Sequence, residues 1–302
     1  MNWHRIQSRY APYFFVAPFL LIFGTFGLYP ILKSVVLSLH ATAGTTEQVY
    51  VGLDNFRYLA RDPNFHQAAL NTVIFAAARV GIQLPLALFL AVLLNSRLVR
   101  WRNVFRFAFF SPYLMGPVFA SILFTLVFAE NFGLLNTALH TLFGSSQDRS
   151  WLQISWLGAP ENVMPALVIL STWLQVGFSM VYFLAALQAV DRDLYEAADV
   201  DGANVMHKFW HVTLPGIKPV LVFVLVFSTI GSLKVFELPW LLLNNTAGPD
   251  QSGLFVVTYL YQNGFIVGDL GYASAIGWTL TGGVLVISLI QIWISGTMRK
   301  ES

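Results

Sequence analysis

Six long apolar stretches constrain this chain more than any other feature of its sequence. They cover about residues 13–39, 69–94, 107–129, 163–187, 219–243 and 273–295. A helix that crosses the hydrocarbon core of a bilayer needs roughly 20 mostly apolar residues, and each stretch reaches that length. In addition, 56% of the residues are hydrophobic and only 11% are charged, unlike the composition of soluble domains. The sequence therefore predicts an all-α membrane protein with six spans, forming one transmembrane domain over residues 1–302.

The basic residues between the stretches predict the orientation of the chain. On the side of the two termini lie Arg5, Arg9, Arg97, Arg100, Arg102, Arg106, Arg192, Lys208, Lys218, Arg299 and Lys300, whereas the other side carries Arg57, Arg61 and Arg149. Because Lys and Arg concentrate in short cytoplasmic loops, we expect both termini to be cytoplasmic. The net charge of +2 gives no indication of nucleic-acid binding.

A polar segment at about 191–219 separates the fourth and fifth stretches. Asp193, followed three residues later by Glu196, has the form of a capping box. We therefore expect Asp193 to be the N-cap of a short helix from 194 to about 201. Gly202 can adopt the left-handed conformation that ends a helix, so the chain should turn there.

A second amphipathic segment is predicted after this turn. Val205, Phe209 and Val212 recur at helical spacing, and Leu214-Pro215 should stop the helix. The whole segment would then be a helix, a glycine turn and a second helix on the cytoplasmic side. An amphipathic linker that lies on the membrane surface is the alternative interpretation of the same pattern.

The sequence lacks the residues that several other functions would need. It contains no cysteine and no G-x-x-x-x-G-K-[ST] phosphate loop, so the chain is not expected to hydrolyse ATP through that motif. H-E-x-x-H and G-x-S-x-G are also absent, and the six histidines lie in loops or near the ends of spans. We expect no enzyme activity, no metal site and no cofactor in this chain.

The same polar segment contains Glu196-Ala197-Ala198, Asp201-Gly202-Ala203 and, further on, Val212-Thr213-Leu214-Pro215. This series resembles the EAA loop of permease subunits of binding-protein-dependent ABC importers. Weaker matches to the carbohydrate class, such as maltose and glycerol-3-phosphate permeases, extend over nearly the whole chain. They are Gly52–Phe56, Asn71-Thr72, Ala91–Asn95, Arg106 to Pro112, Gly133–Asn136 and Gly271–Ala275.

This resemblance implies a type I ABC importer permease in the plasma membrane of a prokaryote, or the inner membrane of a Gram-negative cell. Its implied partners are a second homologous permease subunit, a dimer of cytoplasmic ATPases that carry ATP and Mg, an extracytoplasmic solute-binding protein and membrane lipid. The residues implied in ATPase coupling are Glu196, Ala197 and Ala198 on the docking helix, Asp201, Gly202 and Ala203 in its turn, and Leu214 and Pro215 in the return to the fifth span. Two departures concern partner specificity: Val212 replaces the usual isoleucine, and His207-Lys208 with Trp210-His211 make the second segment bulkier and more polar.

Charged and polar residues within the spans are candidates for the solute pathway. Lys234 and Glu237 are three residues apart on the predicted fifth span, which would place them on one helix face. They either form a mutual salt bridge against the second permease subunit or line the pathway. Arg79 is expected to make a structural contact between helices. Further pathway candidates are Gln175, Trp240 and Asn244.

The solute is not determined by these residues. Sugar, oligosaccharide, polyol and glycerol phosphate all remain open, and the carbohydrate class is favoured by the resemblance alone. A solute that bears phosphate would need cationic partners such as Arg79 or Lys234. A secondary transporter or channel is a remote alternative, since it would need no coupling loop.

Overall fold

The computed structural model describes residues 3–44, 47–96, 99–143 and 154–296. In these ranges six helices are long and apolar enough to cross a membrane: Tyr13–Ser38, Pro63–Asn95, Arg102–Val127, Pro160–Ala189, Val205–Leu233 and Leu270–Ile294. The prediction of six spans is confirmed, although most spans begin earlier than expected. Four of the basic residues that predict the orientation, Arg97, Arg149, Arg299 and Lys300, lie outside the described residues.

The chain forms two compact units. The first comprises Met1–Pro63 and Tyr259–Thr281, and the second comprises Asn64–Thr258 and Gly282–Ser302. The first unit begins with α1 (Trp3–Phe23), a π-helical turn η1 (Gly24–Leu28) and α2 (Tyr29–Ser38). The π turn ends two residues before Pro30, whose ring cannot donate a hydrogen bond and would crowd the preceding turn of an α-helix. The first span therefore continues through the proline.

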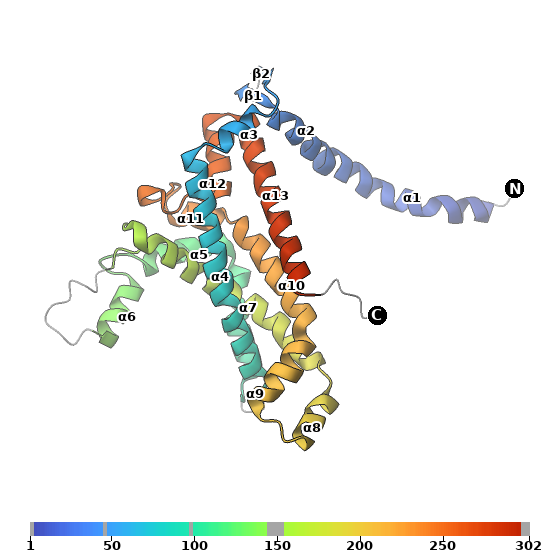
Figure 1. Ribbon diagram of the computed structural model, residues 1–302, viewed down its shortest axis with the longest axis vertical. Helices are drawn as coiled ribbons and strands as arrows, with labels where there is room; N and C mark the ends of the chain where they lie inside the picture. The colour runs from blue at the N-terminus through green and yellow to red at the C-terminus, as the bar shows by residue number, and fades with distance from the viewer. Residues whose placement is uncertain (1–2, 45–46, 97–98, 144–153, 297–302) are drawn as a thin grey trace. The chain divides into compact units, whose positions relative to one another are not determined.

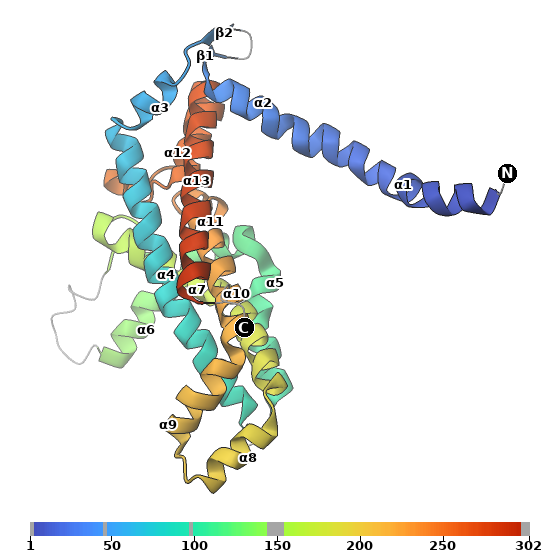
Figure 2. The ribbon, with the colours of Figure 1, turned by 45° about the vertical axis from the view of Figure 1, so that its right-hand side comes forward.

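A small hairpin, absent from the all-α prediction, follows α2. Its strands β1 (His40–Ala43) and β2 (Glu47–Tyr50) pair antiparallel, with His40 opposite Tyr50, and α3 (Asp54–Leu59) comes next (Figure 2). The Asn55 side chain donates to the carbonyl oxygens of Ser38 and His40, both at 2.9 Å. This amide thus holds α3 against the start of the hairpin.

Two carboxylates, the buried Asp62 and the half-buried Asp269, organise the remainder of the first unit. Asp269 Oδ1 accepts from Thr42 Oγ1 at 3.0 Å and from the Tyr272 backbone N–H at 2.9 Å, which caps the start of α13 (Leu270–Ile294). Asp62 Oδ2 accepts from the hydroxyls of Tyr259 and Tyr272. These bonds connect the β-hairpin and Asp62, just after α3, to the segment that contains α12 (Val256–Tyr261) and the π turn η5 (Gln262–Val267).

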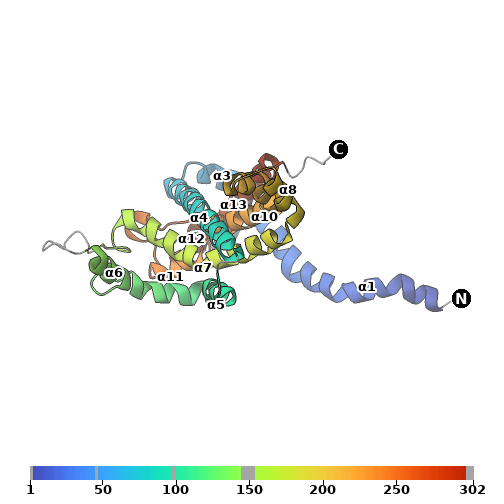
Figure 3. The same cartoon turned by 90° about the horizontal axis from the view of Figure 1, so that it is seen from below.

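The second unit is a helical bundle around α7. It contains α4 (Pro63–Asn95), α5 (Arg102–Val127), α6 (Leu134–Phe143), α7 (Pro160–Ala189), α10 (Leu214–Leu233), α11 (Glu237–Leu242) and the 3-10 turn η4 (Pro249–Gln251) (Figure 1). α5 lies beside α7 (Figure 3). Their backbones approach so closely that a Cβ atom on Gly177 would lie 1.9 Å from the Phe109 carbonyl oxygen. Large buried side chains such as Phe75, Met180 and Phe183 fill the core on either side.

Candidate coupling loop and solute-pathway residues

The first helix of the polar loop, α8 (Arg192–Val200), is capped differently from the prediction. Asp191 is the N-cap, and its Oδ1 accepts from the Asp193 backbone N–H at 3.0 Å. The prediction of Asp193 as N-cap is therefore wrong, and Glu196 closes no capping box. The reason lies in the backbone, which is extended at Val190 and Asp191 after α7 ends, so the earlier aspartate is the residue that precedes the first helical turn.

The C-terminal end of α8 confirms the predicted glycine turn. Gly202 has φ of +74°, in the left-handed region that favours glycine. The Ala203 N–H donates to the Ala198 carbonyl at 2.9 Å, and the Gly202 N–H donates to that of Asp199 at 3.1 Å. This pair of bonds is a Schellman motif, which satisfies two carbonyl groups at the end of the helix.

The second segment consists of α9 (Val205–Lys208) and the π turn η3 (Phe209–Thr213), which leads directly into α10. Asn204 caps α9, because its side-chain oxygen accepts from the His207 N–H at 2.8 Å. The prediction that Leu214-Pro215 stops this helix is wrong, since one helix runs from Val205 to Leu233. The π turn ends two residues before Pro215, as η1 does before Pro30, and the wider turn accommodates the missing donor.

Two side-chain contacts connect α8 to the second segment. The Lys208 ammonium lies 2.5 Å from Asp199 Oδ1, and the Tyr195 hydroxyl lies 2.9 Å from Thr213 Oγ1. Between the two helices is a hollow of about 390 Å³, lined in part by Gly202. The loop is thus a closed helical hairpin at one end of α7 and α10 (Figures 1 and 2).

The sequence-predicted coupling residues lie on this hairpin as follows. Glu196, Ala197, Asp201, Gly202 and Pro215 are exposed, and Ala198, Ala203 and Leu214 are half-buried. The hairpin also exposes large apolar side chains, among them Val205 of the predicted amphipathic segment. Val200 is 89% exposed, Val205 82% and Met206 64%. Leu194 and Trp210 are exposed as well, at 53% and 56%, so both segments of the hairpin expose apolar side chains.

The predicted fifth span is interrupted where the candidate pathway residues begin. Lys234 is the C-cap of α10, and Glu237 starts α11 after the non-helical residue Phe236 (φ −142°, ψ −63°). The two therefore do not share one helix face, and that prediction is wrong. Both side chains are exposed, and they form no ion pair with each other in the described part of the chain. Of the two alternatives for this pair, the mutual salt bridge is thus not formed in the described part of the chain.

The other pathway candidates are only partly brought together. Trp240 lies on α11 and stacks on Phe236 with ring centroids 6.0 Å apart, and Asn244 is exposed just after α11 with φ of +54°. Lys234, Glu237, Trp240 and Asn244 thus share one short segment. Gln175 lies half-buried on α7, and its described contact is a backbone one, in which its carbonyl accepts from Gln83 at 3.4 Å.

Arg79 belongs to a buried polar network between α4 and α7. Its side chain is 2% exposed, and Nε donates to Gln83 Oε1 at 3.1 Å. Gln83 Nε2 in turn donates to Ser179 Oγ on α7 at 2.9 Å. The described hydrogen bonds from this network to α7 are thus made by Gln83, to which Arg79 is bound. Arg79 attracts attention in the sequence because it is a charged residue within an apolar span. Gln83 is uncharged, so nothing in the sequence indicated a role for it.

Six aromatic rings from three helices form a continuous series that sequence reasoning missed. On α5, Phe110 adjoins Tyr113, and Tyr113 adjoins Phe178 on α7. Phe178 adjoins Tyr182 and Phe227, and Phe223 on α10 contacts both of these rings. Neighbouring centroids are 4.8 to 6.1 Å apart. No spacing along one helix reveals this series, because it arises only when the three helices pack together.

Among the described residues, no group of three His, Asp or Glu side chains could hold a metal ion. The site thus consists of a protruding helical hairpin, a helix that leads from it into the bundle, and a helix break that carries polar residues. Residues 83–300, which include all of these features, match the family described as "Binding-protein-dependent transport system inner membrane component". The chain belongs to this family.

Relatives and a solved structure agree with this assignment. The inner-membrane component is 41% identical to the arabinooligosaccharides transport system permease protein AraP of Bacillus subtilis, over 98% of this chain and 91% of the relative. It is 36% identical to the lactose transport system permease protein LacF of Rhizobium radiobacter, over 92% of each chain.

The fold resembles a chain in the crystal structure of a bacterial alginate ABC transporter in complex with alginate pentasaccharide-bound periplasmic protein. The TM-score is 0.83 at 24% identity, covering 99% of this inner-membrane component and 98% of that chain. This likeness confirms the predicted importer-permease fold.

Proposed function

We propose that this inner-membrane component is the permease subunit of an ATP-driven sugar importer and forms half of its translocation pathway. The observation that carries the proposal is the family match together with the 41% identity to an arabinooligosaccharide permease over nearly the whole chain. Because the sequence contains no phosphate loop, the proposal includes partner subunits that carry ATP and Mg and hydrolyse the nucleotide. Sugars or oligosaccharides are favoured as the solute because the relatives named above are permeases for such solutes.

The helical hairpin of residues 191–219 is proposed to dock on the cytoplasmic ATPase. Its support is the rigid construction of the hairpin, with a cap at each end of α8 and two contacts to the second segment. The exposed side chains of Val200, Val205 and Met206 supply the apolar surface that such a contact would bury. This assignment places the hairpin and both termini in the cytoplasm, in agreement with the distribution of Lys and Arg.

The helix break after Lys234 is the proposed solute-pathway segment. Irregular backbone at membrane depth is tolerated where it is buried in protein or lines a water-filled cavity. Lys234, Glu237 and Asn244 are exposed on this segment, so their polar groups can face such a cavity. Trp240, which stacks on Phe236, brings an aromatic ring to the same segment. A second homologous permease would complete the cavity, and an extracytoplasmic binding protein would deliver the solute.

The assembled transporter provides the test of this function. The tagged chain is purified from its native membrane, its co-purifying subunits are identified, and the complex is reconstituted in proteoliposomes with the matching binding protein. We expect uptake of a sugar that requires ATP, the ATPase subunits and the binding protein. Uptake by this chain alone without ATP would instead identify a secondary transporter or channel.

The docking surface has its own test. Val200→Asp places a charge in the apolar surface of the hairpin, and we expect the ATPase to be lost from the purified complex. Val49→Asp is the matched control, because Val49 is an exposed valine of β2 on the other unit. Equal recovery of the ATPase with both variants would contradict the proposed surface.

A further inference from the structure

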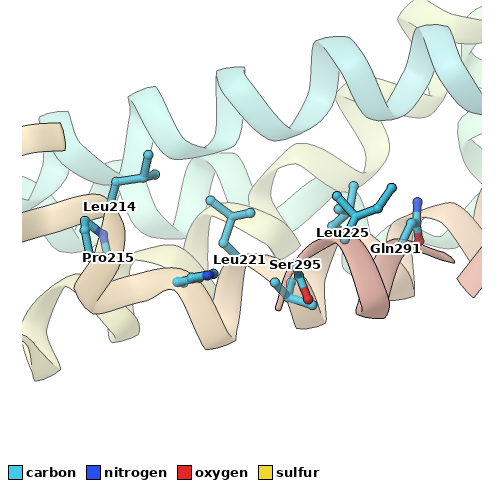
Figure 4. A pocket seen from close by; sticks show the side chains of 9 residues that line it. Leu214, Pro215, Leu221, Leu225, Gln291 and Ser295 are labelled. Carbon is cyan, nitrogen blue, oxygen red and sulfur yellow. The ribbon is translucent and has the colours of Figure 1, made fainter. Parts of the chain in front are cut away.

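An apolar groove lies where the first turns of α10 run beside the last turns of α13. It has a volume of about 620 Å³, within the usual range of roughly 300 to 1,000 Å³ for ligand pockets. Leu221 and Leu225 of α10 and Ile294 of α13 are among the apolar residues that line it. Figure 4 shows Leu221 and Leu225 along the α10 side of the groove and Gln291 and Ser295 along the α13 side.

One cation lines this groove, at the end where α10 begins and α13 ends. The Lys218 side chain reaches the end of α13, since a Cβ atom on Gly296 would lie 4.0 Å from its Nζ atom. The residue is exposed, and within the described ranges its ammonium donates no hydrogen bond and forms no ion pair. Gln291, in contrast, already donates to Thr229 Oγ1 at 2.8 Å. The ammonium is therefore available to an external anion.

A second groove of the same unit provides a comparison. It lies between α4, α5 and α7, has a volume of about 540 Å³ and is lined by apolar residues such as Ile82, Leu86 and Phe109. No charged side chain lines it. Both grooves can take a hydrocarbon chain, but only the groove beside α13 combines an apolar length with a cation at one end. This combination matches an amphipathic ligand with an acidic head.

We propose that the groove between α10 and α13 binds an anionic phospholipid of the surrounding bilayer. One acyl chain lies along Leu221 and Leu225, and the phosphate of the head group lies at Lys218. The distribution of basic residues puts this end at the cytoplasmic face, where anionic lipids attract Lys and Arg close to the membrane. The groove also includes Leu214 and Pro215, so a bound lipid would lie against the junction between the hairpin and α10. The inference rests on membrane insertion and is independent of the transported solute.

Lipid retention by the purified full-length chain tests this proposal. The chain in neutral detergent is incubated with dioleoyl phosphatidylglycerol or dioleoyl phosphatidylcholine, and bound lipid is counted by native mass spectrometry. We expect the wild type to retain the anionic lipid better than the zwitterionic one. Lys218→Gln should weaken anionic-lipid binding about fivefold, the effect of one cation near a membrane surface, and leave phosphatidylcholine binding unchanged. Lys33→Gln, which removes a cation of the first unit, is the control and should retain the preference.

A second pair of variants tests where the acyl chain lies. Leu225→Phe narrows the groove beside α13 and should reduce retention of phosphatidylglycerol, whereas Leu86→Phe in the second groove should not. Equal retention of the two lipids by the wild type, or an unchanged preference in Lys218→Gln, would overturn the proposal. Displacement of the lipid by millimolar inorganic phosphate would also overturn it, because the site would then recognise a free anion. Unchanged lipid counts in Leu225→Phe would show that the groove does not hold the chain, and a helix of another subunit would be its better occupant.

Discussion

Substitutions at Gly202, in the turn of the helical hairpin, can separate the effect of backbone strain from the effect of side-chain size. Gly202 has φ of +74°, and a Cβ atom added there would meet nothing within 4 Å. Substitution therefore costs only the backbone penalty of an L-residue in the left-handed region, about 1–2 kcal/mol. That cost should increase the open population of the turn about 5- to 30-fold. Asn, which tolerates this conformation, should cost less than Ala.

Hydrogen exchange measures this effect directly. The Ala203 amide, which donates to the Ala198 carbonyl, should exchange about 5- to 30-fold faster in Gly202→Ala than in the wild type, with Gly202→Asn in between. Gly268→Ala is a matched control, since Gly268 has φ of +88° and its added Cβ would make only an ordinary 3.7 Å contact with Gly44. It should leave the Ala203 amide unchanged. Equal exchange in wild type and Gly202→Ala would refute the argument from strain.

The assembled transporter then separates strain from docking. In the isolated chain Gly202→Ala and Gly202→Trp should be destabilised similarly, because the surroundings of the turn are open. In the complex, a larger loss of uptake per ATP hydrolysed in the tryptophan variant would come from a clash with the ATPase surface. The same uptake per ATP in the wild type and in both variants would contradict the coupling role of this turn.

Three further predictions follow from other positions. Asp191→Ala should destabilise α8 by about 1 kcal/mol through loss of the N-cap, seen as faster amide exchange at its first turn, whereas Asp193→Ala should have a smaller effect. Gly177→Ala should lower the thermal unfolding temperature of the bundle, since the added Cβ would lie 1.9 Å from a carbonyl oxygen of α5. Gly81→Ala is the control: nothing lies within 4 Å of an added Cβ there, so this substitution should be neutral or stabilising. Burial and the neighbouring Asp62 carboxylate raise the pKa of Tyr259 to about 12. The protonated Tyr259 should therefore stabilise the fold fully below pH about 10, the pKa of an unfolded tyrosine, and this stabilisation should be lost between pH about 10 and 12. Comparison of tyrosinate absorbance between the wild type and Tyr259→Phe measures the titration of this group.

The features that the sequence predicts correctly depend on local chemistry. The spans follow from the length of apolar runs, and the turn at Gly202 follows from the one residue that readily adopts positive φ. The cap of α8 was predicted two residues late, because Asp191 and Asp193 carry the same chemical signal. Which aspartate precedes the helix depends on where the backbone of α7 ends, at Ala189.

The helix break after Lys234 was not predicted, although one local signal lies close to it. Pro239 has no N–H, and in a continuous helix its ring would clash with the Val235 carbonyl. The break is compatible with the position of α11, which packs on α5 and accepts a hydrogen bond from Ser121 Oγ at the Leu238 carbonyl, at 3.3 Å. Such a contact between residues 117 positions apart leaves no periodic pattern in either segment.

The continuity of the helix at Pro215 changes how the hairpin can act on the bundle. A helix that stopped at Leu214-Pro215 would leave a joint between the loop and the fifth span, and motion of the loop could be lost there. Instead one helix runs from Val205 to Leu233, and the π turn of residues 209–213 lets it pass the proline. We therefore expect a displacement of α9 to reach the other end of this helix, which stops at Lys234. Val205 and Met206 of the proposed docking surface, and the proposed pathway segment, thus lie at opposite ends of one continuous helix.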